Sequence, residues 1–409
     1  MELPVTAPEK APQKTNKAQP VRRPFITGTR RIDSATYDKT KTLTAGTQSL
    51  DNYECDAEGF MSGLYILVEG NITVTATGVV VYGSEAPFGI LDTIELQDTN
   101  SKAILGPMTG YELYLCNKYG GYSFNDDARN NADTFLLTAG SAADFAFVLR
   151  LPIEIVHRDA LGSLPNKSSS ATYTLKMRVG AYGVGSVFNA VGLQTIEVRV
   201  RVQQFGWMDP EMTDIQGNAV QGTPPANGAT QIWETQAYGG LASGNMNVRL
   251  TGLDTMIRNL IFVLRDNSAS SATAASSATS SAAQRHSGDL SFPDPFTLQY
   301  EKSTPISRMK TIWRHMIGEW FEYAAARGAA STEAAKARDL GVYPEPFNTD
   351  FGHKPGAESR FGYMPSNSAT SWRASGSIPA SLGTAPYTLT VISNKISPPE
   401  GNVRALAGR

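Results

Sequence analysis

The chain has 409 residues, more than one hydrophobic core usually serves, so two domains are expected. Hydrophobic residues make up 41% of it and charged residues only 18%, while 37 glycines and 23 prolines favour short strands joined by many turns. The formal net charge of −2 excludes a general attraction to nucleic acid or to acidic membranes, so any such contact must be local.

The two cysteines, Cys55 and Cys116, lie far apart in the sequence. They match neither a disulfide framework nor a zinc-binding spacing, which favours buried, inert thiols and assembly in a reducing cytoplasm. The N-terminus lacks the apolar segment of a signal peptide, and no apolar run approaches the roughly 20 residues that span a bilayer. We therefore expect a soluble protein.

Residues 1–40 are predicted to be an extended, basic, proline-rich arm. Five prolines within the first 24 residues exclude a continuous helix, and the apolar content is low. Two interpretations remain open: a disordered tail, or an arm that runs under a neighbouring subunit or contacts an acidic surface. The cations that would make this contact are Lys10, Lys14, Lys17, Arg22, Arg23, Arg30 and Arg31.

Residues 41–207 have the pattern of a β-sheet domain. In residues 194–203, isoleucine and valine alternate with charged or polar residues, which predicts a half-buried antiparallel strand with an exposed outer face. One helix is expected here, because Thr109 and Glu112 have capping-box spacing, Pro107 lies just ahead and Gly120 follows. Further strands are expected at residues 63–68, 71–82, 90–97, 145–151 and 172–179, with a break near Gly70 between the first two.

Residues 208–229 are expected to be a linker, since glycines and prolines interrupt a polar stretch. Its carboxylates, Asp209, Glu211 and Asp214, match no dedicated calcium loop and are expected to be solvated. A second β-domain is predicted at residues 230–396, followed by a tail at 397–409. Its strands are expected at residues 231–235, 246–250, 258–265, 296–300 and 386–393.

The second domain contains a strongly amphipathic helix, predicted over residues 305–326. Thr304 is expected to cap it, Pro305 to occupy its first turn and Gly328 to end it. A shorter helix is expected at residues 332–340. The apolar face of the long helix carries Ile306, Met309, Trp313, Met316, Ile317, Trp320 and Ala324.

The two domains repeat one order of elements. Residues 256–267 form an apolar strand, buried on both faces, that ends in a turn; a Ser/Ala/Thr loop at residues 268–283 and the long helix follow. Residues 90–97 end at a turn in the same way and lead to the first helix. We interpret the chain as two copies of one β-rich unit. The 268–283 loop is either a flexible surface loop or an outward projection.

The sequence contains no recognisable catalytic, metal-binding or cofactor-binding motif. The four histidines are scattered, and the phosphate-binding and dinucleotide-binding loops are missing. Trp313 and Trp320 could form a sugar platform, although their spacing favours a core position, and a glycosidase carboxylate pair would converge only in space. We predict that the protein is not an enzyme and has no catalytic residue, metal or cofactor.

This order of elements resembles the double jelly-roll major capsid proteins of tectiviruses, double-stranded DNA bacteriophages with an internal membrane. The resemblance rests on residues 260–267, on residues 90–100 with the helix at 108–119, and on the helix at 305–323 leading through residues 341–343 into the last strands. It covers residues 45–396. The family's N-terminal helix near the membrane is not matched, because the prolines of the arm interrupt it.

The resemblance implies an all-β fold with minor helices, built as two tandem jelly-roll β-sandwiches. It implies a homotrimer of pseudo-hexameric outline that contacts neighbouring trimers, vertex (penton) proteins and minor capsid proteins. The trimers would tile an icosahedral shell over an internal membrane vesicle, with the basic arm at the membrane or shell floor. The protein would be a virion component, assembled in the host cytoplasm, without sequence-specific nucleic-acid binding. The alternatives are a phage spike or other carbohydrate-binding β-sandwich, and a β-sandwich glycoside hydrolase.

Overall fold

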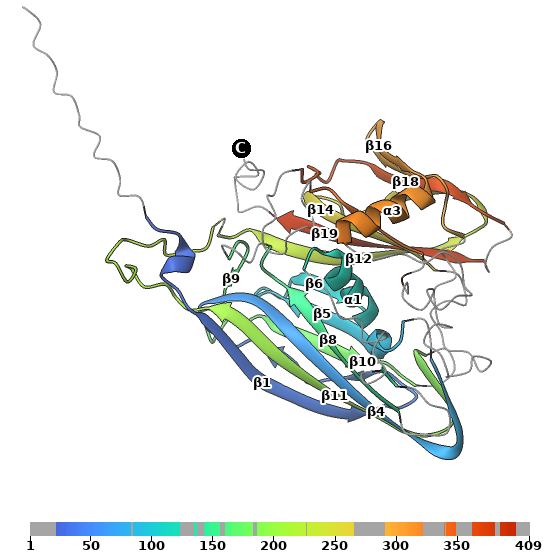
Figure 1. Cartoon of the computed structure of the whole chain (residues 1–409), viewed down its shortest axis with the longest axis horizontal. Coiled ribbons are helices and arrows are strands. Elements are labelled where there is room, and N and C mark those ends of the chain that lie inside the picture. Colours follow the sequence, from blue (N-terminus) through green and yellow to red (C-terminus); the bar gives the residue numbers. More distant parts are fainter. Residues whose placement is uncertain are drawn as a thin grey trace, which may run out of the picture.

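The computed structural model describes two β-rich units that lie side by side (Figure 1). The described residues are 22–82, 85–122, 135–136, 143–155, 160–182, 186–225, 227–265, 291–321, 339, 341–348, 362–380 and 385–397.

The first unit contains two sheets. One has the strand order β1-β11-β4-β8-β7, with β9 paired to β4, and the other runs β6-β5-β10-β2, with β3 paired to β10. The elements are η1 (Phe25–Thr27), β1 (Arg31–Thr42), β2 (Gln48–Ser49), β3 (Tyr53–Glu54), β4 (Phe60–Tyr82), η2 (Phe88–Ile90), β5 (Leu91–Gln97), β6 (Ala103–Met108), α1 (Gly110–Tyr119), β7 (Phe135–Leu136), β8 (Ala143–Pro152), β9 (Leu164–Pro165), β10 (Thr174–Val179) and β11 (Phe188–Trp207).

The second unit also contains two sheets, with the orders β17-β14-β19-β12 and β13-β18-β15-β16. Its elements are β12 (Thr230–Leu241), β13 (Gly244–Leu250), β14 (Met256–Arg265), β15 (Phe296–Tyr300), β16 (Ser303–Arg308), α3 (Lys310–Phe321), β17 (Val342–Pro346), β18 (Trp372–Ile378) and β19 (Tyr387–Ser397).

Both units have the same topology. With β2 and β3 counted together as the second strand, and the two-residue strands β7 and β9 left out, one sheet of each unit contains its first, eighth, third and sixth strands, and the other its second, seventh, fourth and fifth. This double Greek-key order is that of a jelly roll. A helix follows the fifth strand in both: α1 after β6 and α3 after β16. The predicted fold class, two tandem jelly rolls with minor helices, is therefore confirmed.

The units share one sheet and one continuous core. β6 of the first unit pairs in parallel with β12 of the second at Leu105 and Trp233, which joins two four-stranded sheets edge to edge. Most of the buried apolar side chains form one contiguous cluster across this join, and two small clusters lie apart from it. β14 is buried at nine of its ten positions because its own sandwich covers one face and the first unit covers the other, as its apolar sequence predicts.

The predicted alternation in β11 is confirmed, since Ile196, Val198, Val200 and Val202 are buried and the residues between them are not. The predicted break near Gly70 is wrong, because β4 continues through it. Phe145 of β8 lies over this glycine, and a Cβ there would come within 2.0 Å of its ring. Gly70 is thus a position of close packing inside a strand.

The predicted start of the long helix is also wrong. Thr304 and Pro305 belong to the strand β16, and α3 begins at Lys310. β16 is the edge strand of its sheet, where a proline without an N–H is tolerated. The capping box of α1 is confirmed, but Pro107 lies in β6, a strand that is not among the predicted ones. The predicted helix at residues 332–340 and the loop at 268–283 lie outside the described residues, apart from Asp339.

The two units match each other differently from the prediction. Residues 90–97 correspond to β5, the fourth strand of its unit, whereas β14 is a third strand and is equivalent to β4. The other predicted equivalence, that of the helices α1 and α3, agrees with the topology. The error arose because an apolar run records burial on both faces, which depends on the neighbouring unit and not on the position in the jelly roll.

The last part of the predicted arm is a strand. Arg31 to Thr42 form β1, which pairs with β11 from Trp207 to Glu197. Its sequence is polar because one face is exposed, and Tyr37 is its one fully buried residue. Among the described residues, no helix is long and apolar enough to cross a membrane.

Candidate assembly surfaces

One end of the molecule, here called the base, gathers the segments that enter, connect and leave the two units (Figure 1). Arg31 at the start of β1 pairs with Trp207 at the end of β11, and Thr230 at the start of β12 pairs with Ser397 at the end of β19. Residues 22–30 and the linker lie against each other there, where the backbones of Arg23 and Val220 form a bridge. The first and the last of the described residues therefore both lie at the base.

The structure brings four of the seven predicted arm cations to the base. Arg22 is exposed, Arg23 lies 3.9 Å from Asp214, and Arg30 lies 3.7 Å from Glu211. Arg31 stacks over Trp207 at 5.4 Å. Exposed pairs of this kind contribute only about 0–1 kcal/mol, so these side chains can exchange partners at little cost. The other three, Lys10, Lys14 and Lys17, lie outside the described residues.

The linker holds a tight turn at the base with apolar side chains pointing outward. Asp214 accepts hydrogen bonds from the backbone N–H groups of Gln216 and Asn218, and its hydrogen bonds with Asn218 hold the pKa of this carboxyl below its usual value. Ile215 is completely exposed and Met212 is 83% exposed. Among the described residues, no group of three ligand-type side chains could hold a metal ion.

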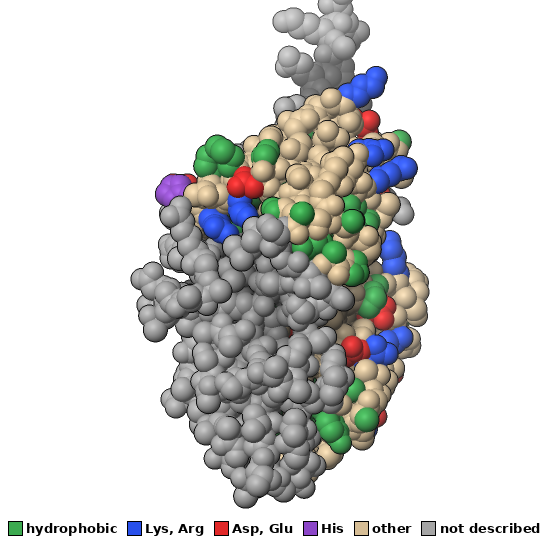
Figure 2. Space-filling model, turned by 90° about the vertical axis from the view of Figure 1, so that its right-hand side faces the viewer, with side chains coloured by type: hydrophobic (Ala, Val, Ile, Leu, Met, Phe, Trp, Pro, Cys, Tyr) green, Lys and Arg blue, Asp and Glu red, His purple; other side chains and the backbone are tan. Residues whose placement is uncertain are grey.

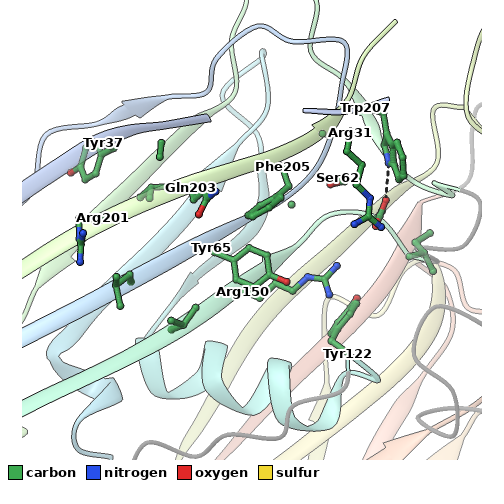
Figure 3. Close-up of a pocket in the computed structure, with 18 of the residues that line it drawn as sticks. Arg31, Tyr37, Ser62, Tyr65, Tyr122, Arg150, Arg201, Gln203, Phe205 and Trp207 are labelled. Atoms are coloured by element: carbon green, nitrogen blue, oxygen red, sulfur yellow. Dashed lines mark hydrogen bonds between the residues drawn. The ribbon is translucent and has the colours of Figure 1, made fainter. Parts of the chain in front are cut away.

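A groove of about 740 Å³ lies on the outer face of the first sheet, next to the base (Figure 3). Tyr65 of β4 and Phe205 of β11 meet edge to face at 5.0 Å in its floor, and Val148 of β8 is 48% exposed beside them. These residues alternate with inward-facing core residues along their strands, so the pleat places them outside. The groove is thus the apolar part of a sheet face that the described residues of the chain leave uncovered.

The groove is rich in arginine. Arg201 pairs with Glu69 at 2.7 Å, but no described carboxylate pairs with Arg150. The guanidinium of Arg150 instead lies 5.8 Å from the ring of Tyr65 and 5.1 Å from that of Tyr122 (Figure 3). Its Nε is buried without a hydrogen-bond acceptor. An unmatched cation in an apolar setting favours a partner that brings carboxylate or carbonyl oxygens.

The outer side of α3 is a second uncovered surface. Trp313, Ile317 and Phe321 face the core, while Ile312 is 49% exposed and Met309, just before the helix, is 56% exposed. His315 and Glu319 lie on the exposed side, 3.3 Å apart. In Figure 2, hydrophobic side chains and charges of both signs are interspersed over the visible described surface.

The corresponding helix of the first unit, α1, is covered by the second unit. Arg258 of β14 donates to the carbonyl of Gly120 at 2.9 Å and stacks on Tyr122 at 5.5 Å, and Asn259 donates to the carbonyl of Tyr119 at 2.8 Å. The last carbonyls of α1, which have no partner within the helix, are thus satisfied by a neighbouring strand.

At the other end of α1, Arg265 of β14 lies 3.6 Å from Glu112 and 2.8 Å from Glu85. Burial raises the pKa of Glu112, and Arg265 opposes this. β14 therefore contacts α1 at both ends. Sequence reasoning missed this contact, although polar Arg258 and Asn259 inside an otherwise apolar strand were its signal.

Several predicted features are buried. Trp313 is fully buried against Phe292, Phe296 and Tyr343, so its core interpretation is correct and the sugar-platform interpretation is wrong for it. Cys55 and Cys116 are free and buried. Burial raises the pKa of Cys55 to about 12 and that of Cys116 further above its usual value, so both thiols are inert at neutral pH.

Comparison with known proteins agrees with the topology. No family model matches the sequence, and no curated protein matches it. Similar structures include the crystal structure of the STIV MCP, with a TM-score of 0.53 and 9% identity, covering 90% of this chain and 97% of that chain. The Faustovirus major capsid protein has a TM-score of 0.53 and 9% identity, covering 95% of this chain and 92% of that one.

A chain from the atomic structure of Sulfolobus Turreted Icosahedral Virus has a TM-score of 0.55 and 10% identity, covering 91% of this chain and 92% of that chain. At these identities the likeness establishes the fold. Because both chains of each pair are covered almost completely, the shared fold is the whole double jelly roll, including the way its two units are joined.

Proposed function

We propose that this protein is a major capsid protein whose trimers, of pseudo-hexameric outline, tile an icosahedral shell over an internal membrane vesicle. The observation that carries the proposal is the repeat of one jelly roll within the chain. Three copies in a closed ring then present six similar sandwiches, which suits a near-hexagonal tile. The fold shared with viral capsid proteins over the full chain supports the same role.

The oligomeric state tests this proposal directly. Light scattering on the purified protein at micromolar concentration should give three times the chain mass of 44.0 kDa, and negative-stain images should show near-hexagonal particles. A stable monomer in both measurements would reject the trimer and, with it, the shell. Neighbouring trimers, vertex proteins and minor capsid proteins are the partners that this role requires, and a virion is the location.

The base is the side that we propose faces the membrane. It carries Arg22 and Arg30, both chain ends and the exposed apolar turn with Met212 and Ile215. Cations attract anionic lipid by about 1 kcal/mol each, and exposed apolar side chains can enter the interfacial region. The combination fits an anionic bilayer better than water.

A vesicle assay separates this part of the proposal from the trimer. A chain lacking residues 2–21 keeps Phe25, which packs in a small core with Phe60 and Trp207, so it should still form trimers. Its flotation with phosphatidylserine vesicles should fall several-fold, and a variant of unchanged length, Lys10→Gln/Lys14→Gln/Lys17→Gln, should lose a similar share. Equal flotation of all three proteins would remove the arm from the membrane contact.

A carbohydrate-binding or hydrolytic role finds less support in the groove. The aromatic faces of Tyr65 and Tyr122 are approached by Arg150, so they do not offer an open sugar platform. Of the carboxylates lining it, Asp38 pairs with Arg199, and Glu154 accepts hydrogen bonds from Ser163 and Trp207. A hydrolase needs two carboxyl groups that can act on substrate.

A further inference from the structure

The duplication inside the chain indicates which surfaces join one copy to the next. We propose that the groove on the first sheet binds the exposed side of α3 from a second copy of this chain, in a heterologous contact that repeats around the trimer. The inference rests on the proposed trimer and names the faces that hold it together.

One chain makes a contact of this kind within itself, between its two units. In the second unit, the outer face of the β17-β14-β19-β12 sheet accommodates α1 of the first unit. Arg258 on this face binds the carbonyl of Gly120 and the side chain of Asn394, and stacks on Tyr122. All ten residues of α1 are buried, between this face and η2, β5 and β8 of its own unit.

The equivalent surfaces on the outside of the molecule are not covered by any part of the chain that the structure describes. The β8-β4-β11-β1 sheet is the first unit's counterpart of the sheet that accommodates α1, and its outer face holds the groove. β14 is buried on both faces, whereas Tyr65, Leu67 and Glu69 on the equivalent strand β4 are only partly buried. α3 is the counterpart of α1, and only three of its twelve residues are buried.

The two uncovered surfaces are complementary in chemistry. Val148 and Tyr65 supply apolar surface on the sheet, and Met309 and Ile312 supply it at the start of α3. The guanidinium of Arg150 lies between the rings of Tyr65 and Tyr122, and no described carboxylate pairs with it. In the internal contact, Arg258 likewise stacks on Tyr122. On the second half of α3, the exposed carboxylate of Glu319 lies 3.3 Å from His315.

In the proposed trimer this contact runs in one direction around the ring. Each chain has one groove and one α3 surface, so the occupied groove of one copy leaves its own α3 free for the next. A ring closes when the last α3 meets the first groove. Arg31 and Trp207, where the base meets the first sheet, line one end of the groove, whereas the exposed turn with Met212 and Ile215 does not line it.

A mixing experiment tests the pairing of the two faces. Val148→Asp should disable the groove and leave α3 intact, while Ile312→Asp should disable α3 and leave the groove intact. Each variant alone should be a monomer by light scattering. Mixed in equal amounts, they should form a heterodimer of twice 44.0 kDa, because one intact pair of faces remains and the chain of contacts cannot continue.

The matched control is Ile215→Asp, the same change at the fully exposed turn of the base, which should stay trimeric. The heterodimer also shows that both variants are folded, and circular dichroism melts check each alone. If the wild-type protein is a trimer but either face variant remains one, or if the mixture does not associate, the proposed faces are wrong while the trimer stands. A monomeric wild-type protein would instead reject the proposed function.

Discussion

α1 and α3 occupy the same place in two copies of one jelly roll, yet their surroundings differ. α1 lies at the centre of the molecule against β14, and every one of its residues is buried, including Glu112, Asn117 and Lys118 (Figure 1). α3 follows β16 in the same way but keeps one side exposed. The second unit of the same chain contacts α1, whereas the described residues leave one side of α3 exposed.

This comparison shows that burial in a duplicated protein is set by neighbours as well as by local sequence. The exposed side of α3 carries Met309 and Ile312, which a helix turned permanently to water would replace with polar residues at no cost to the core. The polar side of α1 is instead tied to β14 by Arg265 and Arg258. Internal contacts within one chain thus serve as a template for contacts between chains.

The largest expected effect is on the inner side of α3. Trp313→Ala should lower the free energy of unfolding by about 3–5 kcal/mol, because it empties a fully buried site and removes the hydrogen bond from Trp313 Nε1 to the carbonyl of Pro344. Urea unfolding followed by circular dichroism at fixed protein concentration measures it. Thr311→Ala, on the exposed side of the same helix, should stay within about 0.5 kcal/mol of wild type. Equal effects at both positions would mean that α3 is not anchored by this face.

The internal contact of α1 gives the second prediction. Arg258→Met keeps the length of the side chain but removes the donors to the Gly120 carbonyl and to Asn394, so we expect a loss of about 2–4 kcal/mol in the same assay. Arg249→Met on the exposed face of β13 is the matched control, with an expected change within about 0.5 kcal/mol. A neutral Arg258→Met would show that the units do not depend on each other there.

A buried carboxyl near α3 makes stability depend on pH. Burial raises the pKa of Glu345 from 4.5 to about 8, and Arg308, 2.7 Å away, only partly opposes this. The folded state therefore binds more protons than the unfolded state between these values. The stabilisation is complete below pH 4.5 and is lost as the pH rises through 8.

Glu345→Gln, which stays neutral, should remove up to about 1.4 kcal/mol per pH unit from the pH dependence of the unfolding free energy between roughly pH 5 and 8. Glu54→Gln on the exposed side of β3 should leave this dependence unchanged. Identical slopes for wild type and Glu345→Gln would mean that the carboxyl is ionised in the folded protein.

The smallest effects concern how the two helices begin. The side chain of Thr109 accepts the N–H of Glu112, whose carboxylate accepts the N–H of Thr109, so Thr109→Ala should cost about 1 kcal/mol. α3 is capped by a residue distant in sequence: Asp294 accepts the N–H of Lys310 at 3.1 Å. Asp294→Ala should cost about 0.5–1 kcal/mol in urea unfolding with an unchanged denaturant slope. An unchanged free energy of unfolding in either variant would show that its capping hydrogen bond does not stabilise the helix concerned.

Local patterns in the sequence predicted the elements whose chemistry is local. The alternation in β11, the capping box of α1 and the apolar run of β14 are each written in a few consecutive residues, and the structure has all three. The candidate site was predicted only in part. The arm arginines were proposed from the charge of residues 1–40. The groove, in contrast, combines Tyr65, Arg150 and Phe205 from three strands that are far apart in the sequence.

The amino-acid sequence by itself determined that the chain is a duplicated β-structure in which each copy contains a helix, because the spacing of apolar residues records which face of an element is buried. Only the tertiary structure decided what covers each face. It placed Pro305 in an edge strand, made β14 the equivalent of β4, and buried α1 while leaving α3 open. The reason is that the local pattern of apolar residues records that a face is buried, but not which segment, distant in sequence, buries it.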